Sequence, residues 1–297
     1  IIDIRPTLCY NIYYMRLSKF FLKTHKSISS EIEQRSNQIL IKGGYIAESV
    51  AGRFYYLPLG MIVRDNIVKV VERNMSSIGA LKMMAPVLHP KVLWEETNRD
   101  KAVGFELMTI VDRNKNSFVL GGTAEEMFVD LIRHYNISYK DLPFCLYQFS
   151  QKFRDELRAR GGLLRLREFL MKDAYSFHSS KDEFETYYLK MTDLYRKIFD
   201  ELGLKTSVVK SDNGYIGGEY CHELVVESEI GESKYFVAGE YAAHEDIASF
   251  DRGELSNNED RLDLSKIQAI RGKSIQDGVE LHNKPAEKHL KNVCYIA

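Results

Sequence analysis

The sequence predicts an α+β fold in which antiparallel strands are flanked by helices. Apolar residues recur at helical spacing along residues 60–79 and 184–202. Two strand-like segments, residues 145–156 and 163–177, follow one another with only a short charged and glycine-rich loop between them. That pattern is typical of two antiparallel strands. Helices mixed with antiparallel strands favour an α+β domain over a series of βαβ units.

The composition is that of a globular chain with little net charge. Its 297 residues are 44% hydrophobic and 28% charged, which is sufficient for a sizeable core. The formal net charge of −1 gives no overall attraction to nucleic acid, although a local basic patch can still bind RNA. The cysteines (Cys9, Cys145, Cys221 and Cys294) are too scattered for a disulfide framework or a zinc knuckle, and they fit a reducing cytoplasm. No apolar run approaches the ~18 residues of a membrane span, so no membrane partner is expected.

The first predicted unit is a long helix followed by a short strand. Residues 60–79 place several apolar side chains on one helical face, with charged residues between them. These apolar residues are Val63, Ile67, Val70, Val71 and Ile78. Residues 81–88 are apolar but are interrupted by Pro86. Because proline cannot donate to a strand ladder, this segment is predicted to be an edge strand or a strand that ends sharply.

A strand and a helix are predicted next. Residues 118–120 favour a strand, and two glycines end it. Thr123 and Glu126 then have the spacing of a capping box ahead of an amphipathic helix.

The longest helix is predicted at residues 184–202. Ser180 and Glu183 have the same capping-box spacing just before it. Gly203 is the predicted stop, since glycine readily takes the left-handed conformation that ends many helices.

The charged hairpin carries the densest group of candidate site residues. Strand periodicity puts Arg154 and Glu156 on one face, and Arg165, Arg167 and Phe169 on one face of the returning strand. Arginine can hold a phosphate with two hydrogen bonds, glutamate can accept from an exocyclic amine, and phenylalanine can stack on a base. The hairpin therefore suits a nucleotide. A solvated hairpin held by salt bridges is the alternative that the residues alone leave open.

Arg154-x-Glu156, a loop, and Arg165-x-x-x-Phe169 together resemble motif 2 of the class II aminoacyl-tRNA synthetases. The following run Met-Lys-Asp-Ala-Tyr-Ser-Phe-His, residues 171–178, is similar to the prolyl-tRNA synthetases of the bacterial type. The likeness extends from about Met15 to the last residue. It implies the antiparallel class II sheet flanked by helices, and it implies ATP with Mg²⁺ as the cofactor.

The resemblance assigns a role to each matching residue of the hairpin. Arg154 and Glu156 are the expected catalytic residues: Arg154 binds the α-phosphate of ATP and the carboxylate side of the adenylate, and Glu156 contacts the adenine amino group. Phe169 stacks on adenine, and Arg165 supports the triphosphate. The loop 157–164 closes over ATP and later approaches the acceptor end of tRNA.

Thr123-Ala124-Glu125 resembles the Thr-x-Glu loop with which this family binds proline. The secondary ammonium of proline needs a carboxylate and one further acceptor once it is removed from water. Thr123 can serve as a proline ligand, as a helix cap, or as both. The chain departs from the family at Gly122 and Ala124, where proline and histidine are frequent.

Residues 212–224 resemble the Gly-Gly segment of the family that ends in Ser-His-Glu-Phe, with Cys221 and Leu224 as departures. His222 is the candidate wall of the proline pocket, and Glu223 is the candidate on the ATP and Mg²⁺ side. A zinc site or a thiol nucleophile is disfavoured, because neighbouring residues on a strand point to opposite faces. No metal site built from protein ligands alone is expected.

The resemblance also predicts the organisation of the chain. Residues 1–14 are expected to be an upstream extension, residues 15–250 the class II core, and residues 251–297 a linker and the beginning of the inserted editing domain. Pro86 matches motif 1, which builds the dimer interface in this class, so a homodimer is expected. Motif 3, with its glycine-rich unit and second arginine, is not found after motif 2. The chain is therefore expected to be a truncated form with an incomplete sheet and weak or no activation activity.

The function implied is that of a cytoplasmic proline–tRNA ligase, which activates proline with ATP and transfers it to the proline tRNA. One alternative is a related class II enzyme for threonine, serine or glycine, which Thr123-x-Glu125 and residues 175–178 disfavour. Another is a non-catalytic paralogue that acts as a binding module. The intact residues Arg154, Glu156 and Phe169 disfavour that reading, since a module without ATP chemistry has no need of them.

Overall fold

The computed structural model describes residues 19–30, 32–101, 107–214, 218–249 and 279–280. The chain divides into two compact units, Ile1–Ser249 and Phe250–Ala297, and the elements below all belong to the first. The expected extension at residues 1–14 lies outside the described residues. So does the expected linker and insertion at 251–297, apart from residues 279–280.

The centre of the first unit is the predicted hairpin. Strands β7 (Phe144–Phe153) and β8 (Glu168–Phe177) pair antiparallel over their full length, from Phe144 opposite Phe177 to Phe153 opposite Glu168. The short strand β3 (Leu81–Lys82) pairs parallel with β7 at the edge of this sheet, as Pro86 predicted for its segment. The antiparallel pairing is confirmed, but the strands are shorter than predicted because the chain leaves the ladder after Phe153 and rejoins it near Arg167.

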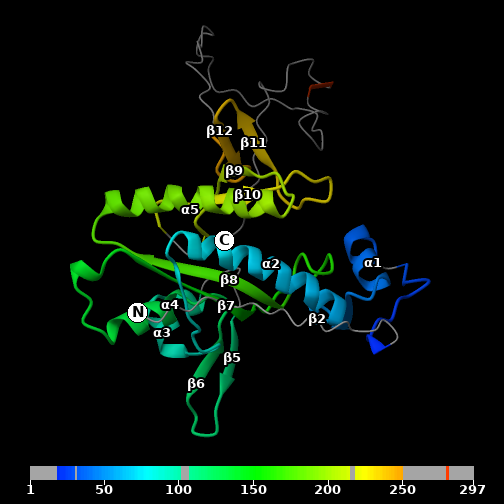
Figure 1. Cartoon of the computed structure of the whole chain (residues 1–297), viewed down its shortest axis with the longest axis horizontal. Coiled ribbons are helices and arrows are strands. Elements are labelled where there is room, and N and C mark those ends of the chain that lie inside the picture. Colours follow the sequence, from blue (N-terminus) through cyan, green and yellow to red (C-terminus); the bar gives the residue numbers. More distant parts are fainter. Residues whose placement is uncertain (1–18, 31, 102–106, 215–217, 250–278, 281–297) are drawn as a thin grey trace, which may run out of the picture. The chain divides into compact units, whose positions relative to one another are not determined.

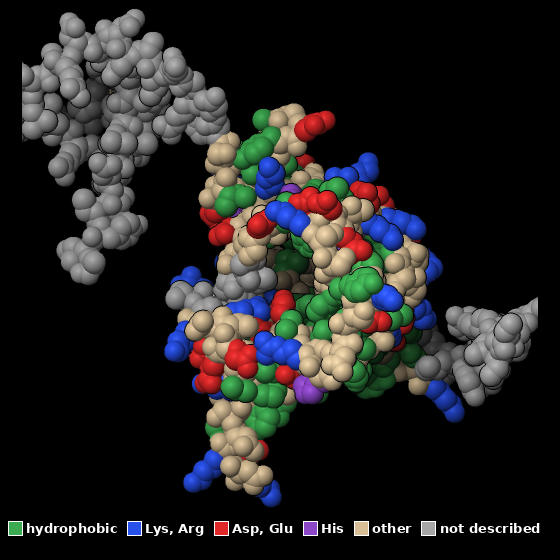
Figure 2. Space-filling view, turned by 90° about the vertical axis from the view of Figure 1, so that its left-hand side faces the viewer, with side chains coloured by type: hydrophobic (Ala, Val, Ile, Leu, Met, Phe, Trp, Pro, Cys, Tyr) green, Lys and Arg blue, Asp and Glu red, His purple; other side chains and the backbone are tan. Residues whose placement is uncertain are grey.

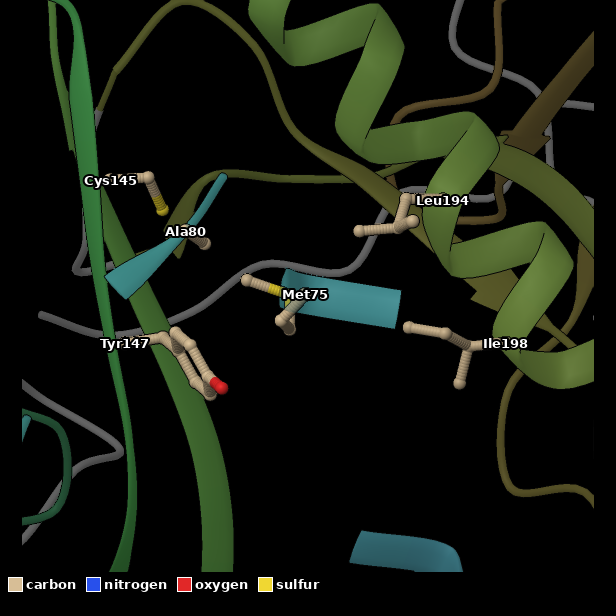
Figure 3. Close-up of a cluster of buried hydrophobic side chains, with 6 residues drawn as sticks. All are labelled: Met75, Ala80, Cys145, Tyr147, Leu194 and Ile198. Atoms are coloured by element: carbon tan, nitrogen blue, oxygen red, sulfur yellow. The ribbon is translucent and has the colours of Figure 1, made fainter. Parts of the chain in front are cut away.

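Two long helices cover one face of this sheet (Figure 1). They are α2 (Pro58–Ser77) and α5 (Lys181–Glu201). Met75 of α2 and Leu194 and Ile198 of α5 point toward Cys145 and Tyr147 of β7, and together they form a buried cluster (Figure 3). Burying each large side chain of this kind stabilises the fold by ~1.5–3 kcal/mol.

The prediction for α2 is only partly confirmed. The helix forms where the apolar spacing places it, and Val71 packs against the buried cluster. Val63 and Ile67, predicted for the same apolar face, remain 44% and 42% exposed. The α2 residues that pack into the buried cluster, Val71 and Met75, lie in the C-terminal half of the helix.

The other face of the sheet carries the smaller elements (Figure 1). Helix α4 (Glu125–Arg133) packs Phe128 against Tyr175 of β8, with the ring centroids 4.3 Å apart. Helix α3 (Lys91–Glu96) adjoins α4 and the sheet β4-β6-β5. These three strands, all antiparallel, are β4 (Leu88–Pro90), β6 (Ser117–Leu120) and β5 (Met108–Val111). The β5–β6 hairpin projects from the body, with basic side chains at its tip (Figure 2).

The remaining elements lie at two ends of the unit. Helix α1 (Arg35–Lys42) precedes the hairpin of β1 (Ile46–Val50) and β2 (Arg53–Tyr56). A separate sheet has the order β10-β9-β12-β11, in which β9 and β12 pair parallel. Its strands are β9 (Ser207–Lys210), β10 (His222–Val225), β11 (Tyr235–Ala238) and β12 (Tyr241–His244). Among the described residues, no helix is both long and apolar enough to cross a membrane.

The two predicted capping boxes have different outcomes. Ser180 is the N-cap of α5, and its hydroxyl accepts a hydrogen bond from the backbone N–H of Glu183. Only this half of the predicted box forms, because the Glu183 carboxylate accepts from the backbone N–H of Ser179 and not from that of Ser180. Gly203 follows the helix with a φ of +79°, as predicted for a stop. The prediction at Thr123 is wrong, because α4 begins one residue later, with Ala124 at the N-cap position and no side-chain cap.

Candidate active site

The Thr-x-Glu loop lies between strand β6 and helix α4. Thr123 is buried, and its hydroxyl donates to Oε2 of Glu125 at 2.5 Å. The hydroxyl therefore contacts the carboxylate of its own triplet and not a backbone N–H of the helix. This places an acceptor oxygen and a carboxylate side by side, which is the pair that a buried ammonium requires.

A buried arginine holds the carboxylates at the start of α4. Arg99, in the short 3-10 turn η2 (Arg99–Lys101), lies with Nη1 3.3 Å from Oε2 of Glu125 and 2.7 Å from Oε1 of Glu126. Its guanidinium also lies over the ring of Trp94, 5.1 Å from the centroid. Nothing in the local sequence distinguished Arg99, because it meets Glu125 only through tertiary packing.

Polar side chains line the sheet face beneath the loop. Asp173 of β8 accepts from Gln148 Nε2 at 2.8 Å through Oδ2, and its Oδ1 lies 3.2 Å from Nζ of Lys152. The hydroxyl of Tyr175 donates to the same Oδ2 at 2.7 Å and accepts from the backbone N–H of Ala124 at 2.9 Å. The sequence contained a signal for this group. Gln148 and Lys152 are polar residues at even positions of an otherwise largely apolar strand, and even positions share one face.

Arg154 is brought to the same place by the end of β7. The backbone N–H of Phe153 donates to the carbonyl of Gly121 at 3.1 Å, which joins the hairpin to the Thr-x-Glu loop. Nη2 of Arg154 makes a long contact of 3.5 Å with the carbonyl of Gly122. Its guanidinium lies 5.3 Å from the ring centroid of Phe169, so the two side chains face the same space, although Arg154 follows the end of β7 and does not lie on the strand as predicted.

Glu156 and Arg165 lie in the loop that joins β7 to β8, and not on the strands where periodicity put them. They pair with each other, with Nε of Arg165 2.8 Å from Oε2 of Glu156. Arg165, followed by the backbone N–H of Arg158, lowers the pKa of the Glu156 carboxyl below its usual range. Glu232, from the segment between β10 and β11, pairs with Arg165 at 3.3 Å and with Arg160 at 2.8 Å. Glu156 and Arg165, which take part in these salt bridges, are thus the same residues that the sequence assigned to a nucleotide.

Arg167 faces the β1–β2 hairpin, which its strand position did not predict. Its Nε donates to the carbonyl of Glu156 at 2.7 Å, and its Nη1 donates to the carbonyl of Ala51 at 2.8 Å. Gly52, at a φ of +77°, accepts from the backbone N–H of Arg167 at 2.9 Å. A Cβ at Gly52 would lie 2.6 Å from Cβ of Ala159, so the hairpin tip and the loop approach each other too closely for a side chain.

His222 and Glu223 belong to the other sheet, on strand β10. Nδ1 of His222 lies 3.0 Å from the hydroxyl of Tyr188 on α5, and burial, then Lys210, lowers the pKa of His222. Glu223 accepts from Oγ of Ser211 at 2.8 Å. The structure thus joins Thr123, Glu125, Arg154 and Phe169 in one group, and it engages His222 and Glu223 in local contacts elsewhere. Among the described residues, no three His, Cys, Asp or Glu side chains are placed to hold a metal ion.

The sequence of this region matches a known family. Residues 105–276 match the profile of the tRNA synthetase class II core domain (G, H, P, S and T), and they make up more than half of the chain. The chain belongs to this family. The α+β architecture and the motif 2 resemblance agree with that membership.

Individual relatives are more specific. The chain is 38% identical to proline–tRNA ligase of Staphylococcus haemolyticus over 283 residues, which cover 95% of this chain and 50% of that protein. Proline–tRNA ligases of Geobacillus thermodenitrificans and Thermotoga maritima are 37% and 36% identical over the same length. The chain thus spans about half the length of the curated relatives it matches.

A solved structure is similar in fold. It is the Giardia lamblia prolyl-tRNA synthetase in complex with prolyl-adenylate, with a TM-score of 0.52 and 20% sequence identity. The similar region covers 56% of this chain and 35% of that one. At this identity the likeness concerns the fold of the core.

Proposed function

We propose that this chain is the part of a proline–tRNA ligase that binds proline and ATP. The observation that carries the proposal is the side-by-side placement of Thr123 and Glu125, with Arg154 reaching the carbonyl of the neighbouring Gly122. An amino acid carries its ammonium and its carboxylate on the same carbon atom. A carboxylate next to a guanidinium complements that pair.

The charges around the loop are matched to an amino acid. Three carboxylates, those of Glu125, Glu126 and Asp173, lie among three cations, Arg99, Lys152 and Arg154. A zwitterionic ligand keeps this balance, because its ammonium faces Glu125 and its carboxylate faces Arg154.

The nucleotide lies along the hairpin in this proposal. Phe169 stacks on adenine and Arg154 binds the α-phosphate. The Arg154 guanidinium lies 5.3 Å from the centroid of the Phe169 ring, so one nucleotide can contact both side chains. Arg165 supports the triphosphate. To do so it exchanges one carboxylate partner, Glu232, for phosphate oxygens, while Glu156 contacts the adenine amino group.

Two steps follow from this arrangement. A carboxylate oxygen of proline attacks the α-phosphorus of ATP, the bond to the bridging oxygen of the β-phosphate breaks, and prolyl-adenylate and pyrophosphate form. The terminal ribose hydroxyl of the proline tRNA then attacks the prolyl carbonyl, and AMP leaves. Arg154 stabilises the charge that develops on the α-phosphate, and the binding loop supplies orientation.

In this proposal Mg²⁺ arrives with the nucleotide, and Glu223 would have to exchange its contact with Ser211 for the ion. Glu223 offers one carboxylate with Ser211 beside it, and Mg²⁺ is commonly bound through one or two protein carboxylates plus substrate phosphates. When bound, the ion neutralises phosphate charge. His222 remains the proposed wall of the proline pocket, which requires that it exchange its contact with Tyr188 for the ligand.

The proposal includes a homodimer in the cytoplasm, where tRNA is charged. Exposed apolar side chains on α2 and in the segment around Pro86 support the dimer, since the resemblance to motif 1 lies in that region. They are Ile62, Val63, Ile67, Leu81, Met84 and Leu88.

The test is binding of a non-hydrolysable adenylate analogue, prolyl-sulfamoyladenosine, measured by isothermal titration calorimetry. We expect the chain to bind it at least about tenfold more tightly than the glycyl, seryl and threonyl analogues. Glu125→Gln removes the charge partner of the ammonium while keeping the shape. It is expected to weaken binding by about tenfold or more, since hydrogen bonds to charged groups contribute ~1.5–3 kcal/mol.

A matched control is Glu96→Gln, on the neighbouring helix α3, where the carboxylate pairs with Arg133 at the surface. That variant is expected to bind like the wild type. Tighter binding of the seryl or threonyl analogue would assign the chain to another amino acid. Absence of binding to every analogue would reject the proposal.

A further inference from the structure

We infer that Tyr175 and Asp173 are positioning residues that orient the hydroxyl of Thr123, so that its oxygen presents lone pairs to the ammonium of the bound amino acid. The inference rests on the proposed function. It adds that a chain of buried hydrogen bonds behind the Thr-x-Glu pair makes the site select a ligand with an ammonium.

The chain of hydrogen bonds begins at an ion pair. Lys152 and Asp173 have side chains only 2% and 6% exposed, with Nζ and Oδ1 3.2 Å apart. An ionised carboxylate accepts hydrogen bonds and cannot donate them. Asp173 therefore receives both the amide of Gln148 at 2.8 Å and the hydroxyl of Tyr175 at 2.7 Å.

The hydroxyl of Tyr175 therefore donates its proton to a hydrogen bond with Asp173. Burial, then the charges of Glu125 and Asp173, raises the pKa of Tyr175 above its ordinary range, so the phenol keeps this proton at neutral pH. Toward the Thr-x-Glu loop the phenol oxygen offers only lone pairs. One of them accepts the backbone N–H of Ala124 at 2.9 Å.

The hydroxyl of Thr123 thus has two acceptors for neighbours. Oε2 of Glu125 lies 2.5 Å away and the phenol oxygen of Tyr175 lies 3.4 Å away. A hydroxyl has one proton and two lone pairs. Its proton turns to one of these acceptors, and a lone pair remains for an N–H of the ligand. A ligand with an N–H is favoured, and one with an ether oxygen or a methylene at that position is not.

The hydroxyl of Tyr175 can be removed without loss of its ring contact. The ring is held against Phe128, with centroids 4.3 Å apart, and a phenylalanine keeps that contact. Tyr175→Phe therefore removes the hydroxyl alone. The backbone N–H of Ala124 then loses its acceptor, and the Thr123 hydroxyl loses one of its two acceptor neighbours.

The experiment compares two ligands that differ at one position. Prolyl-sulfamoyladenosine carries the ring ammonium, and the cyclopentanecarbonyl analogue carries a methylene in its place. Both are titrated calorimetrically into the wild type, Tyr175→Phe, and Tyr187→Phe. Tyr187 is the matched control, a partly buried tyrosine on α5 that packs against the opposite face of the sheet.

We expect Tyr175→Phe to weaken the binding of the prolyl analogue by about tenfold, which corresponds to ~1.4 kcal/mol of binding free energy. The cyclopentanecarbonyl analogue should change by less than about twofold, because it does not use the Thr123 lone pair. Tyr187→Phe should change neither. A loss of the same size for both ligands assigns Tyr175 a general structural role and overturns the inference, as does unchanged binding of both.

A second variant, Asp173→Asn, acts on the phenol through its other partner. The amide replaces one acceptor oxygen by a donor, so the Tyr175 proton loses its charged acceptor and can turn toward Thr123. Thermal unfolding checks that both variants fold, because Asp173→Asn also removes the carboxylate that faces Lys152. The same ammonium-specific loss is expected. If the wild type binds neither analogue, the proposed function fails and the inference fails with it. If the wild type binds the prolyl analogue and both variants bind it equally well, the inference alone fails.

Discussion

The polar side chains beneath the Thr-x-Glu loop are buried and contact one another. They hold the loop in place, but burying them costs free energy of folding. Burial lowers the pKa of the Lys152 ammonium, and the charge of Asp173 opposes that shift. Gln148 bonds both to Asp173 and to the backbone N–H of Ala85, at 2.8 and 3.0 Å, so it ties the site to the segment after β3. Removing one member of such a network leaves the others buried without a partner, which costs more than the contact itself contributes.

His89 is the clearest case, and it makes the stability of the protein depend on pH. Its ring is 1% exposed and accepts from Nε1 of Trp94 at 3.2 Å, and burial, then Lys152, lowers its pKa to about 4. The unfolded chain protonates His89 near pH 6.5 and the folded chain only near pH 4. Stability is therefore complete above pH 6.5 and is lost as the pH falls from 6.5 to 4. The expected loss from this group is up to ~3 kcal/mol.

Urea unfolding at several pH values between 4 and 7 measures this loss. His89→Gln keeps an acceptor for Trp94 but does not titrate, so its free energy of unfolding should fall less steeply over the same range. Carboxylates titrate alike in both proteins, and the difference between the two slopes isolates His89. Parallel slopes would mean that the histidine is not held neutral.

At the scale of elements, close backbone approaches set which helices and loops can meet. Helix α2 begins at Pro58, which suits the first helical turn, and Gly60 follows two residues later. A Cβ at Gly60 would lie 2.1 Å from the carbonyl oxygen of Tyr45. The start of the helix therefore rests directly on the backbone that leads into β1.

Gly60→Ala is expected to destabilise the protein, against the ordinary preference of helices for alanine. In an open helix this change is favourable by ~0.5–1 kcal/mol. Here the overpacking should outweigh the gain and lower the free energy of unfolding by about 2 kcal/mol, as urea denaturation can measure. The control is Asn66→Ala on an exposed position of the same helix, which should be neutral or slightly stabilising. A Gly60→Ala protein as stable as the wild type would contradict the close approach.

At the scale of the whole molecule, the first unit leaves apolar surface on one long helix. Ile62, Val63 and Ile67 of α2 are 42–49% exposed, although their spacing is that of a buried helical face. On the face shown in Figure 2, acidic and basic side chains are interspersed. The proposed homodimer covers the apolar part of α2 with a second copy.

The dimer can be tested with the chain itself by sedimentation velocity at micromolar concentrations. We expect the wild type to sediment as a dimer and Ile67→Asp to shift it to a monomer, because burying an unpaired carboxylate in the interface is costly. Leu189→Asp, at a position of α5 that is 66% exposed, is the matched control and should leave the dimer intact. A monomeric wild type would contradict the proposed dimer. A dimeric Ile67→Asp would show that α2 does not form the interface.

Local patterns in the sequence were sufficient for the elements whose causes are local. The hairpin of β7 and β8, helix α2, and the cap of α5 at Ser180 all follow from periodicity and from side chains that act within a few residues. The same reasoning failed at Thr123, since this residue fits a capping box with Glu126 and a Thr-x-Glu loop with Glu125. The tertiary neighbours Arg99 and Tyr175 hold the triplet in the second arrangement.

The sequence by itself thus determined the α+β class, the family, and the residues of the charged hairpin. Only the tertiary structure decided that Glu156 and Arg165 leave the strands and pair with each other, and that Arg167 turns to the β1–β2 hairpin. It also brought Arg99, Lys152, Asp173 and Tyr175 to the Thr-x-Glu loop. The physical reason is that hydrogen bonds and ion pairs between distant residues depend on how the elements pack, and periodicity records only which face of its own element a residue occupies.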